Sequence, residues 1–194
     1  MFERFTDEAK LAAHEARHAA VAGRAAAADD VHLLIGCCSV ENGRALACLA
    51  RCGVEGEVLV ARSWALCEAR PPHEAESRSR TVTFTPAAKR VLRLAREAAD
   101  ELRHRDIGSD HLLLGVLRAD GEATELLRNL GITDEDLCAA TLAERRARLD
   151  VEAAAALEPM TRVLRDALEV CAAAGEPALA AELRALIESL EKPK

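Results

Sequence analysis

The chain has 194 residues, a net charge of −7 and a very small share of aromatic residues, 2%. Half of its residues are hydrophobic, and the helix formers Ala, Leu, Arg and Glu dominate the sequence. This composition excludes a β-sandwich or barrel, which draws on β-branched and aromatic residues. The acidic balance and the scarcity of aromatics also argue against nucleic-acid binding through a basic patch or through base stacking.

No apolar run reaches the roughly 20 residues that a membrane helix needs. The first residues also lack the apolar core of a signal peptide, so we expect a cytoplasmic protein without a membrane partner. An odd number of cysteines, seven, without regular spacing favours reduced thiols over a disulfide framework. We expect these thiols to be small buried hydrophobic groups without a metal or redox role.

An internal repeat organises the sequence. With a shift of 79 residues, Phe5-Thr6 falls on Phe84-Thr85, and the segment 32–36 (His-Leu-Leu-Ile-Gly) falls on 111–115 (His-Leu-Leu-Leu-Gly). After a slip of one residue, Gly53 matches Gly131. We predict two homologous repeats, 1–66 and 81–146, joined by a linker at 67–80 and followed by a C-terminal extension at 147–194.

Each repeat is predicted to contain four helices. The first helix begins after Thr6 or Thr85, because threonine is a favourable N-cap, and Pro86 suits the first position of the second copy. A fourth helix follows the glycine that ends the third. The other boundaries are predicted at matched positions: Asp30 and Ser109 for the second helix, and Gly53 and Gly131 for the end of the third.

The extension is predicted to be a helical hairpin. Pro159 and Pro177 suit first helical positions, and Gly175 lies between the two helices. An apolar stripe at helical spacing follows: Leu179, Leu183, Leu186, Ile187 and Leu190. The predicted fold class is therefore all-α, a pseudo-twofold tandem of two four-helix repeats with a C-terminal hairpin.

Three segments resemble the Clp repeat of the N-terminal domain of Clp/Hsp100 unfoldases, the ClpC type in particular. They are 1–6 (Met-Phe-Glu-Arg-Phe-Thr), 84–89 (Phe-Thr-Pro-Ala-Ala-Lys) and 107–115 (Ile-Gly-Ser-Asp-His-Leu-Leu-Leu-Gly). In ClpC-like unfoldases this domain precedes ATPase modules. This sequence contains no Gly-x-x-x-x-Gly-Lys-Ser/Thr motif, so we expect no ATP hydrolysis from it.

The resemblance implies two sites for phosphoarginine, each at a helix start that presents free N–H groups to phosphate. In the family an acidic residue pairs with the guanidinium group. The second repeat has Thr85 and, in place of the family's Glu, Asp110, whereas the first has Thr6 but Val31. We expect the second site to be possible and the first to be weak or lost. Alternatively, both threonines are ordinary caps, which is the fuller explanation for Thr6.

The resemblance also implies a hydrophobic patch that binds exposed apolar segments, adaptors and cyclic peptide antibiotics. His14, Arg93 and Arg96 make its rim more polar than in the family. Alternatively, Phe2 and Phe84 plug the junction between the repeats. The matching positions are Phe2, Lys10, His14, Phe84, Lys89, Leu92 and Arg93.

The segment 14–18 (His-Glu-Ala-Arg-His) matches the H-E-x-x-H motif of zinc hydrolases. Its counterpart in the second repeat has Arg93 and Glu97 at the histidine positions, and no third ligand follows at a familiar spacing. A zinc hydrolase is therefore the disfavoured alternative, and we expect no catalytic residue, metal or cofactor. His32 and His111 recur in both repeats, which favours a structural role.

These observations predict a non-enzymatic binding protein related to Clp N-terminal domains. As an adaptor or regulator it would dock on a Clp unfoldase or protease through residues 151–194. As a decoy it would sequester cyclic peptide antibiotics or phosphoarginine-bearing proteins.

Overall fold

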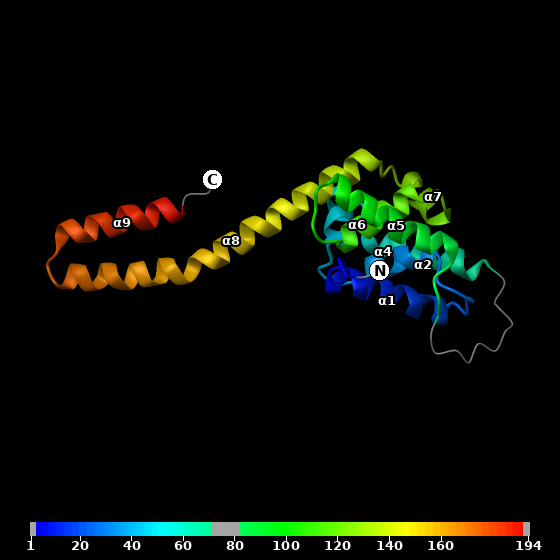
Figure 1. Ribbon diagram of the computed structural model, residues 1–194, viewed down its shortest axis with the longest axis horizontal. Coiled ribbons are helices and arrows are strands. Elements are labelled where there is room, and N and C mark those ends of the chain that lie inside the picture. The colour runs from blue at the N-terminus through cyan, green and yellow to red at the C-terminus, as the bar shows by residue number, and fades with distance from the viewer. Residues whose placement is uncertain (1–2, 71–81, 192–194) are drawn as a thin grey trace. The chain divides into compact units, whose positions relative to one another are not determined.

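The computed structural model describes residues 3–70 and 82–191, which form helices and irregular segments without a β-strand (Figure 1). The predicted all-α class is thus confirmed. The chain divides after Glu144 into two compact units, two residues before the predicted end of the second repeat. The first unit holds α1 (Asp7–Ala22), α2 (Asp30–Ser39), α3 (Arg44–Arg51), α4 (Gly56–Glu68), α5 (Pro86–Glu101), α6 (Ser109–Arg118), α7 (Glu122–Asn129) and the start of α8 (Asp134–Ala173).

The two repeats have the same local structure at matched positions. The turn after α1 has a left-handed residue, Arg24 with φ 51°, and the turn after α5 has Arg103 with φ 56°. The glycines predicted to end the third helices, Gly53 and Gly131, have φ of 74° and 78°, a region that glycine enters without strain. Helix α4 continues to Glu68, so the predicted linker begins within it, and residues 71–81 lie outside the described part.

Each repeat is bound to the other by a short parallel bridge. Phe5 pairs with Ile107, and Phe84 pairs with Ala28. In the first bridge the amide of Thr6 donates to the carbonyl of Ile107 at 3.0 Å, and in the second the amide of Thr85 donates to the carbonyl of Ala28 at 2.9 Å. The segment before each first helix therefore lies against the loop that precedes the second helix of the other repeat.

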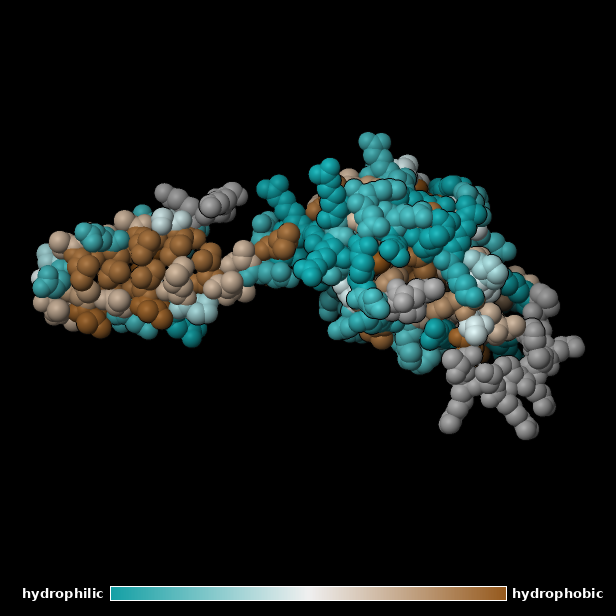
Figure 2. All heavy atoms as spheres, viewed as in Figure 1, coloured by the Kyte–Doolittle hydropathy of each residue, from teal (hydrophilic) through white to brown (hydrophobic). Residues whose placement is uncertain are grey.

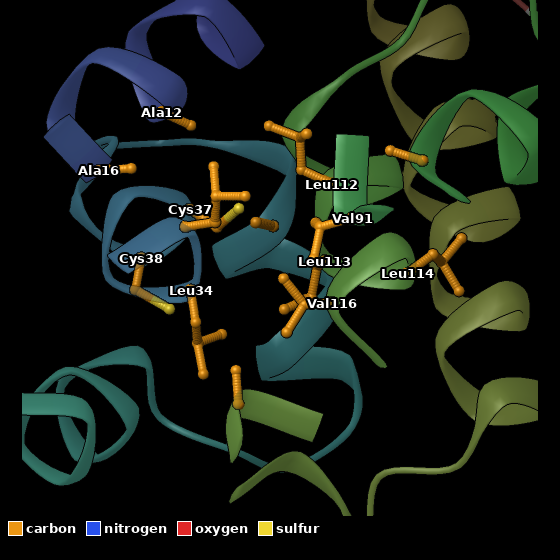
Figure 3. Packing of buried hydrophobic residues seen from close by; sticks show 14 of the residues in the cluster. Ala12, Ala16, Leu34, Cys37, Cys38, Val91, Leu112, Leu113, Leu114 and Val116 are labelled. Carbon is orange, nitrogen blue, oxygen red and sulfur yellow. The ribbon is translucent and has the colours of Figure 1, made fainter. Parts of the chain in front are cut away.

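Small residues allow the first two helices of each repeat to pack closely. A Cβ atom at Gly36 would lie 2.1 Å from the carbonyl oxygen of Ala12, and one at Gly115 would lie 2.4 Å from that of Val91. Figure 3 shows Ala12 and Ala16 on the side of α1 that faces α2. Helices α2 and α6 are buried almost throughout, so the core of this unit lies around them.

The third helix of each repeat is capped by a side chain from the other repeat. Helices α3 and α7 follow Gly43 and Gly121, which have no side chain to satisfy the first amides. Ser109 of α6 accepts a hydrogen bond from the amide of Ala45 at 2.9 Å. Asp30 of α2, at the equivalent position, accepts one from the amide of Ala123 at 3.1 Å. Each repeat thus supplies the acceptor that caps the third helix of the other repeat.

The second unit is a helical hairpin formed by the C-terminal part of α8 and by α9 (Pro177–Glu191). Gly175 turns the chain with φ 75°, and Arg165 pairs with Glu191 at 2.5 Å. Pro177 begins α9 as predicted, whereas Pro159 lies inside α8. The prediction that a helix starts at Pro159 is wrong. Proline removes only one backbone hydrogen-bond donor from α8, and the Ala and Leu residues before Pro159 favour helix strongly enough for α8 to continue through it.

In the part of the chain that the structure describes, no single helix has the length and apolar composition of a membrane span. The pair α2 and α3 reaches that composition only when counted together, and the two helices are bent by 93°.

Candidate functional site

The two threonines that open the repeats are N-caps with the same geometry. Thr6 Oγ1 accepts a hydrogen bond from the amide of Ala9, and Thr85 Oγ1 accepts one from the amide of Ala88, both at 3.2 Å. The predicted capping role is therefore confirmed for both threonines. Each helix start also offers unpaired backbone amides and the positive end of the helix dipole, which suit an anion.

The structure does not bring Thr85 and Asp110 together, as the sequence comparison within one repeat implied. The crossed bridges place Thr6 beside Ile107, three residues before Asp110, whereas Thr85 lies beside Ala28. The pairing is corrected accordingly: the start of α1 is near Asp110, and the start of α5 is near Val31 of the other repeat. The alignment of two repeats reports equivalent positions, and it cannot tell which copy supplies the neighbour.

Asp110 is buried, with 1% of its surface exposed, at the start of α6. Its Oδ1 atom lies 3.0 Å from Nδ1 of His111 but has no partner in hydrogen-bonding geometry. The amide of Gly108 donates to Nδ1 of His111 at 3.0 Å. Burial opposes the ionisation of Asp110, but the neighbouring His111 and the charge of Arg44 hold its pKa below the ordinary value. The guanidinium of Arg44 lies beside Gly108 and within the electrostatic reach of Asp110. Asp110 thus presents a buried carboxylate oxygen without a donor, next to an arginine of this chain.

Glu8 links this carboxylate to the start of α1. Its Oε1 atom accepts the amide of Arg44 at 2.6 Å and also accepts the hydroxyl of Ser109. Two acidic groups, Glu8 and Asp110, therefore lie near one arginine, Arg44. The sequence analysis missed Glu8 and Arg44, because both act across the repeat boundary and neither belongs to a motif.

The members of the predicted hydrophobic patch lie in two different environments in the structure, some in the core and some on the surface. Phe84 and Leu92 are buried, at 9% and 4% exposure, and belong to the core. The guanidinium of Arg17 lies over the ring of Phe84, 4.6 Å from its centroid. This position at the bridge to Ala28 fits the alternative in which Phe84 plugs the junction of the repeats. Phe2 lies outside the described residues.

The other members of the predicted patch are exposed and polar. Lys10 pairs with Asp7 at 2.9 Å, and Arg93 pairs with Glu97 at 2.6 Å. Lys89 and His14 are exposed. These four positions are thus charged or polar rather than apolar, which is the direction expected from His14 and Arg93 in the sequence.

The two repeated histidines have structural roles, as predicted. His32 and His111 both lie three residues after an N-cap and bond to it in a capping box. Nδ1 of His32 lies 2.6 Å from the carboxylate of Asp29, and its Nε2 lies 3.8 Å from Sγ of Cys67. Nε2 of His111 instead lies 2.9 Å from Nδ1 of His104. These bonds hold each ring inside the first unit.

The charge states of the first-repeat pair follow from this geometry. Burial opposes the protonation of His32, but hydrogen bonds to Asp29 and Cys67 raise its pKa to about 9. Burial likewise opposes the ionisation of Asp29, but the hydrogen bonds and charge of His32, together with Arg70, lower its pKa to about 2. The pair is therefore ionised at neutral pH. The sequence signal for this pair is a capping-box spacing, with Asp29 three residues before His32.

The buried cysteines are poor nucleophiles at neutral pH. Burial raises the pKa of Cys38 and of Cys48 to about 12, and it raises that of Cys37 as well. The cysteines in the described part of the chain are unbridged.

Comparison with known proteins identifies the relatives of this chain. The profile of the family described as "Clp repeat (R) N-terminal domain" matches residues 4–130. The chloroplast chaperone ClpC of Pisum sativum is 57% identical over 51 residues, which are 26% of this chain and 6% of the relative. The negative regulator of genetic competence ClpC/MecB of Bacillus subtilis (strain 168) is 30% identical over 134 residues, which are 69% of this chain and 16% of the relative.

A solved structure has the same fold. The crystal structure of the N-terminal domain of the caseinolytic protease associated chaperone ClpD from Arabidopsis thaliana aligns with a TM-score of 0.59 and 24% identity. The alignment covers 75% of this chain and 97% of that structure. Since the family profile covers well over half of its residues, the chain belongs to the Clp repeat (R) N-terminal domain family.

Proposed function

We propose that this protein is a cytoplasmic, non-catalytic recognition protein that binds the substrates, tags or peptide ligands of a Clp unfoldase. The observation that carries the proposal is the pair of matched helix starts at Thr6 and Thr85, set in a duplicated body of the Clp N-terminal family. Both starts present unpaired amides to solvent at half-buried N-caps, which suits a ligand that carries an anionic group.

The start of α1 is the better candidate for a ligand that carries both phosphate and guanidinium, as phosphoarginine does. The support is Asp110, whose buried Oδ1 lacks a donor and lies on the side of the first unit where Thr6 meets Ile107. Phosphate would bind at the amides that follow Thr6, and the guanidinium would pair with Asp110 after displacing Arg44. The start of α5 has Val31 as its neighbour across the bridge and offers phosphate binding alone.

Titration of the full chain with free phosphoarginine tests this assignment. We expect Asp110→Ala to weaken binding at least about tenfold, since it removes the charge-assisted contact with the guanidinium. Thr6→Ala should also weaken binding, because it removes the cap that holds the first turn whose amides would bind the phosphate. Thr85→Ala is the matched comparison, because it removes an equivalent cap from the other helix start, and it should leave the affinity of the site at α1 unchanged. If Asp110→Ala binds as tightly as the parent, the site is assigned wrongly, and circular dichroism checks that the variant is folded.

We also propose that the hairpin, residues 145–191, is the arm that docks on a Clp partner and makes the protein an adaptor or regulator. The support is its set of large apolar side chains that are at least 45% exposed. Figure 2 shows hydrophobic atoms concentrated on the hairpin. Charged positions alternate with them, as at the edge of an interface. The exposed apolar residues are Leu149, Val151, Met160, Val163, Val170, Leu179 and Leu186.

A binding assay with a purified ClpC-type unfoldase separates the adaptor from the decoy. The full chain with Val163→Ser and Val170→Ser should lose the unfoldase, because these side chains are 65% and 68% exposed and serve no internal packing. The same variant should still bind phosphoarginine. A decoy behaves differently: it binds a cyclic peptide antibiotic or a phosphoarginine-bearing protein at full strength and shows no affinity for the unfoldase.

A further inference from the structure

Three potential metal ligands gather on the exposed side of α1. The ligand atoms of His14, Glu15 and His18 all lie within 4.8 Å of one another. The two imidazole rings have centroids 4.1 Å apart, and Nδ1 of His14 lies 3.7 Å from the carboxylate of Glu15. Residues four apart on a helix share a face, so the backbone itself sets the spacing of the two imidazoles.

We propose that His14, Glu15 and His18 form a binding site for a divalent transition metal, with Zn²⁺ and Ni²⁺ as the ions of matching chemistry. Imidazole nitrogen and carboxylate oxygen are ligands of Zn²⁺, and imidazole also suits Ni²⁺ and Cu²⁺. Two imidazoles and a carboxylate leave at least one coordination position open to water. Mg²⁺ and Ca²⁺, which prefer oxygen ligands, are excluded by the same chemistry.

The site differs from the zinc hydrolase that its sequence motif first indicates. In the hydrolase motif the glutamate acts as a base on a metal-bound water, and another residue supplies the third ligand. Here Glu15 is itself within ligand distance of the imidazoles, so the missing third ligand comes from inside the motif. His14 is 57% exposed and Glu15 33% exposed, so the group lies on a helix surface, and we propose binding without hydrolysis.

The cations on the same helix are engaged elsewhere and do not oppose a metal ion at close range. The ammonium of Lys10, one turn before His14, pairs with Asp7 at 2.9 Å. The guanidinium of Arg17 lies over the ring of Phe84. The metal-binding face therefore has three donors, and neither Lys10 nor Arg17 of α1 has to be displaced from it.

The second repeat supplies a matched control. Arg93 and Glu97 of α5 occupy the positions equivalent to His14 and His18, and they form an ion pair at 2.6 Å. Leu94 stands where α1 has Glu15. The double variant His14→Arg/His18→Glu thus copies onto α1 the ion pair that this protein already carries on α5. The variant helix keeps a stabilising i, i+4 pair but has no imidazole at these two positions.

Isothermal titration of the full-length protein with ZnCl₂ and with NiCl₂ tests the site. We expect one equivalent of metal per chain. The affinity should fall at least about tenfold in His18→Ala, because removing even a residue that only supports a metal ligand costs at least this much. The His14→Arg/His18→Glu variant should not bind at this site. If that variant binds one equivalent with the parent's affinity, the metal lies on another group, such as a half-buried thiol, and the proposal is wrong.

Thermal unfolding gives a second readout that does not depend on stoichiometry. The two imidazoles can chelate one ion only while α1 is helical, so Zn²⁺ should raise the Tm of the parent. The His14→Arg/His18→Glu variant should have a similar Tm without metal and show no rise with it. A rise of equal size in both proteins would overturn the proposal.

The reverse exchange tests the contribution of Glu15. The variant Arg93→His/Glu97→His should create a second equivalent on α5 that binds more weakly than the first, because Leu94 supplies no carboxylate. Adding Leu94→Glu to it should bring the two affinities together. Equal affinities before that addition would remove Glu15 from the ligand set and contradict the three-ligand site.

Discussion

The two repeats give the same histidine different polar neighbours. Nδ1 of His32 in the first repeat accepts the amide of Asp29 at 3.3 Å and lies 2.6 Å from the carboxylate of the same residue, which pairs in turn with Arg70 at 2.5 Å. Nδ1 of His111 in the second accepts the amide of Gly108 at 3.0 Å, and its Nε2 lies 2.9 Å from Nδ1 of His104. The carboxylate beside His32 thus comes from its N-cap residue, Asp29, whereas the carboxylate beside His111 comes from Asp110, because its N-cap is Gly108.

The comparison teaches that a duplicated fold tolerates different electrostatic solutions at one position. The first repeat uses a buried ion pair that an arginine from the end of α4 completes, and this arginine also reaches Glu122 of the second repeat at 2.5 Å. In the second repeat the ring of His111 lies beside a second histidine, His104, and the carboxylate of Asp110. Packing is the same in both, because the main-chain turns and close helix contacts recur, while the polar groups have diverged.

The largest expected effect lies in a feature that the repeats share. Gly36→Ala and Gly115→Ala should each lower the free energy of unfolding by about 3 kcal/mol, because the new Cβ would meet main-chain atoms that cannot move aside. Urea unfolding measures the loss, and Gly36→Ala should be the more severe. Gly56→Ala is the control: its Cβ would lie 2.3 Å from the tip of Leu46, a flexible side chain, and should cost far less.

The second effect separates the repeats by pH. The pKa of His32 is raised from 6.5 to about 9, so its ion pair stabilises the fold fully below pH 6.5 and is lost as pH rises through 9. We expect a decline of between about 2 and 3 kcal/mol over this window. Asp29→Asn keeps a capping side chain and removes the charge, so its unfolding free energy should fall less between pH 6.5 and pH 9. An unchanged slope would show that the pair is not ionised in the folded protein.

The third effect concerns the caps that the repeats exchange. Asp30→Ala should cost about 2 kcal/mol and Ser109→Ala about 1 kcal/mol, because each leaves a buried amide at the start of α7 or α3 without an acceptor. Hydrogen exchange at Ala123 and Ala45 reports the change locally. Faster exchange confined to the helix in the same repeat as the substitution would contradict the exchanged arrangement.

The smallest effect tests how alike the repeats are. Thr6→Ala and Thr85→Ala should each cost about 1 kcal/mol, because each removes a cap at 3.2 Å. Thr6→Ala should be slightly the larger loss, because the Thr6 hydroxyl also donates to the carbonyl of Ile107 at 3.4 Å. Thermal unfolding measures both, and Thr→Ser at either position should restore most of the loss. A clearly larger loss in Thr85→Ala would contradict this order.

Much of the fold was predictable because its signals are local. Thr6, Thr85 and the glycines at 53 and 131 mark helix ends through backbone geometry, and the repeat revealed them twice. The exchange between repeats was not predictable, since a sequence match identifies equivalent residues and not neighbours; this is why Asp110 was first paired with Thr85. The burial of Leu92 and the continuity of α8 through Pro159 depended on packing and on helix propensity over many residues, which short motifs do not record.

The crossed bridges of Phe5 with Ile107 and of Phe84 with Ala28 have a consequence for ancestry and for engineering. They are the contacts that two separate copies of one repeat would make as a twofold dimer. A gene for a single repeat would therefore encode a polypeptide whose folding is coupled to dimerisation. Fusing two such genes would make the association of the repeats independent of protein concentration. Within one chain, the halves can differ in their polar groups, as at Asp29 and Gly108, while the crossed bridges hold them together.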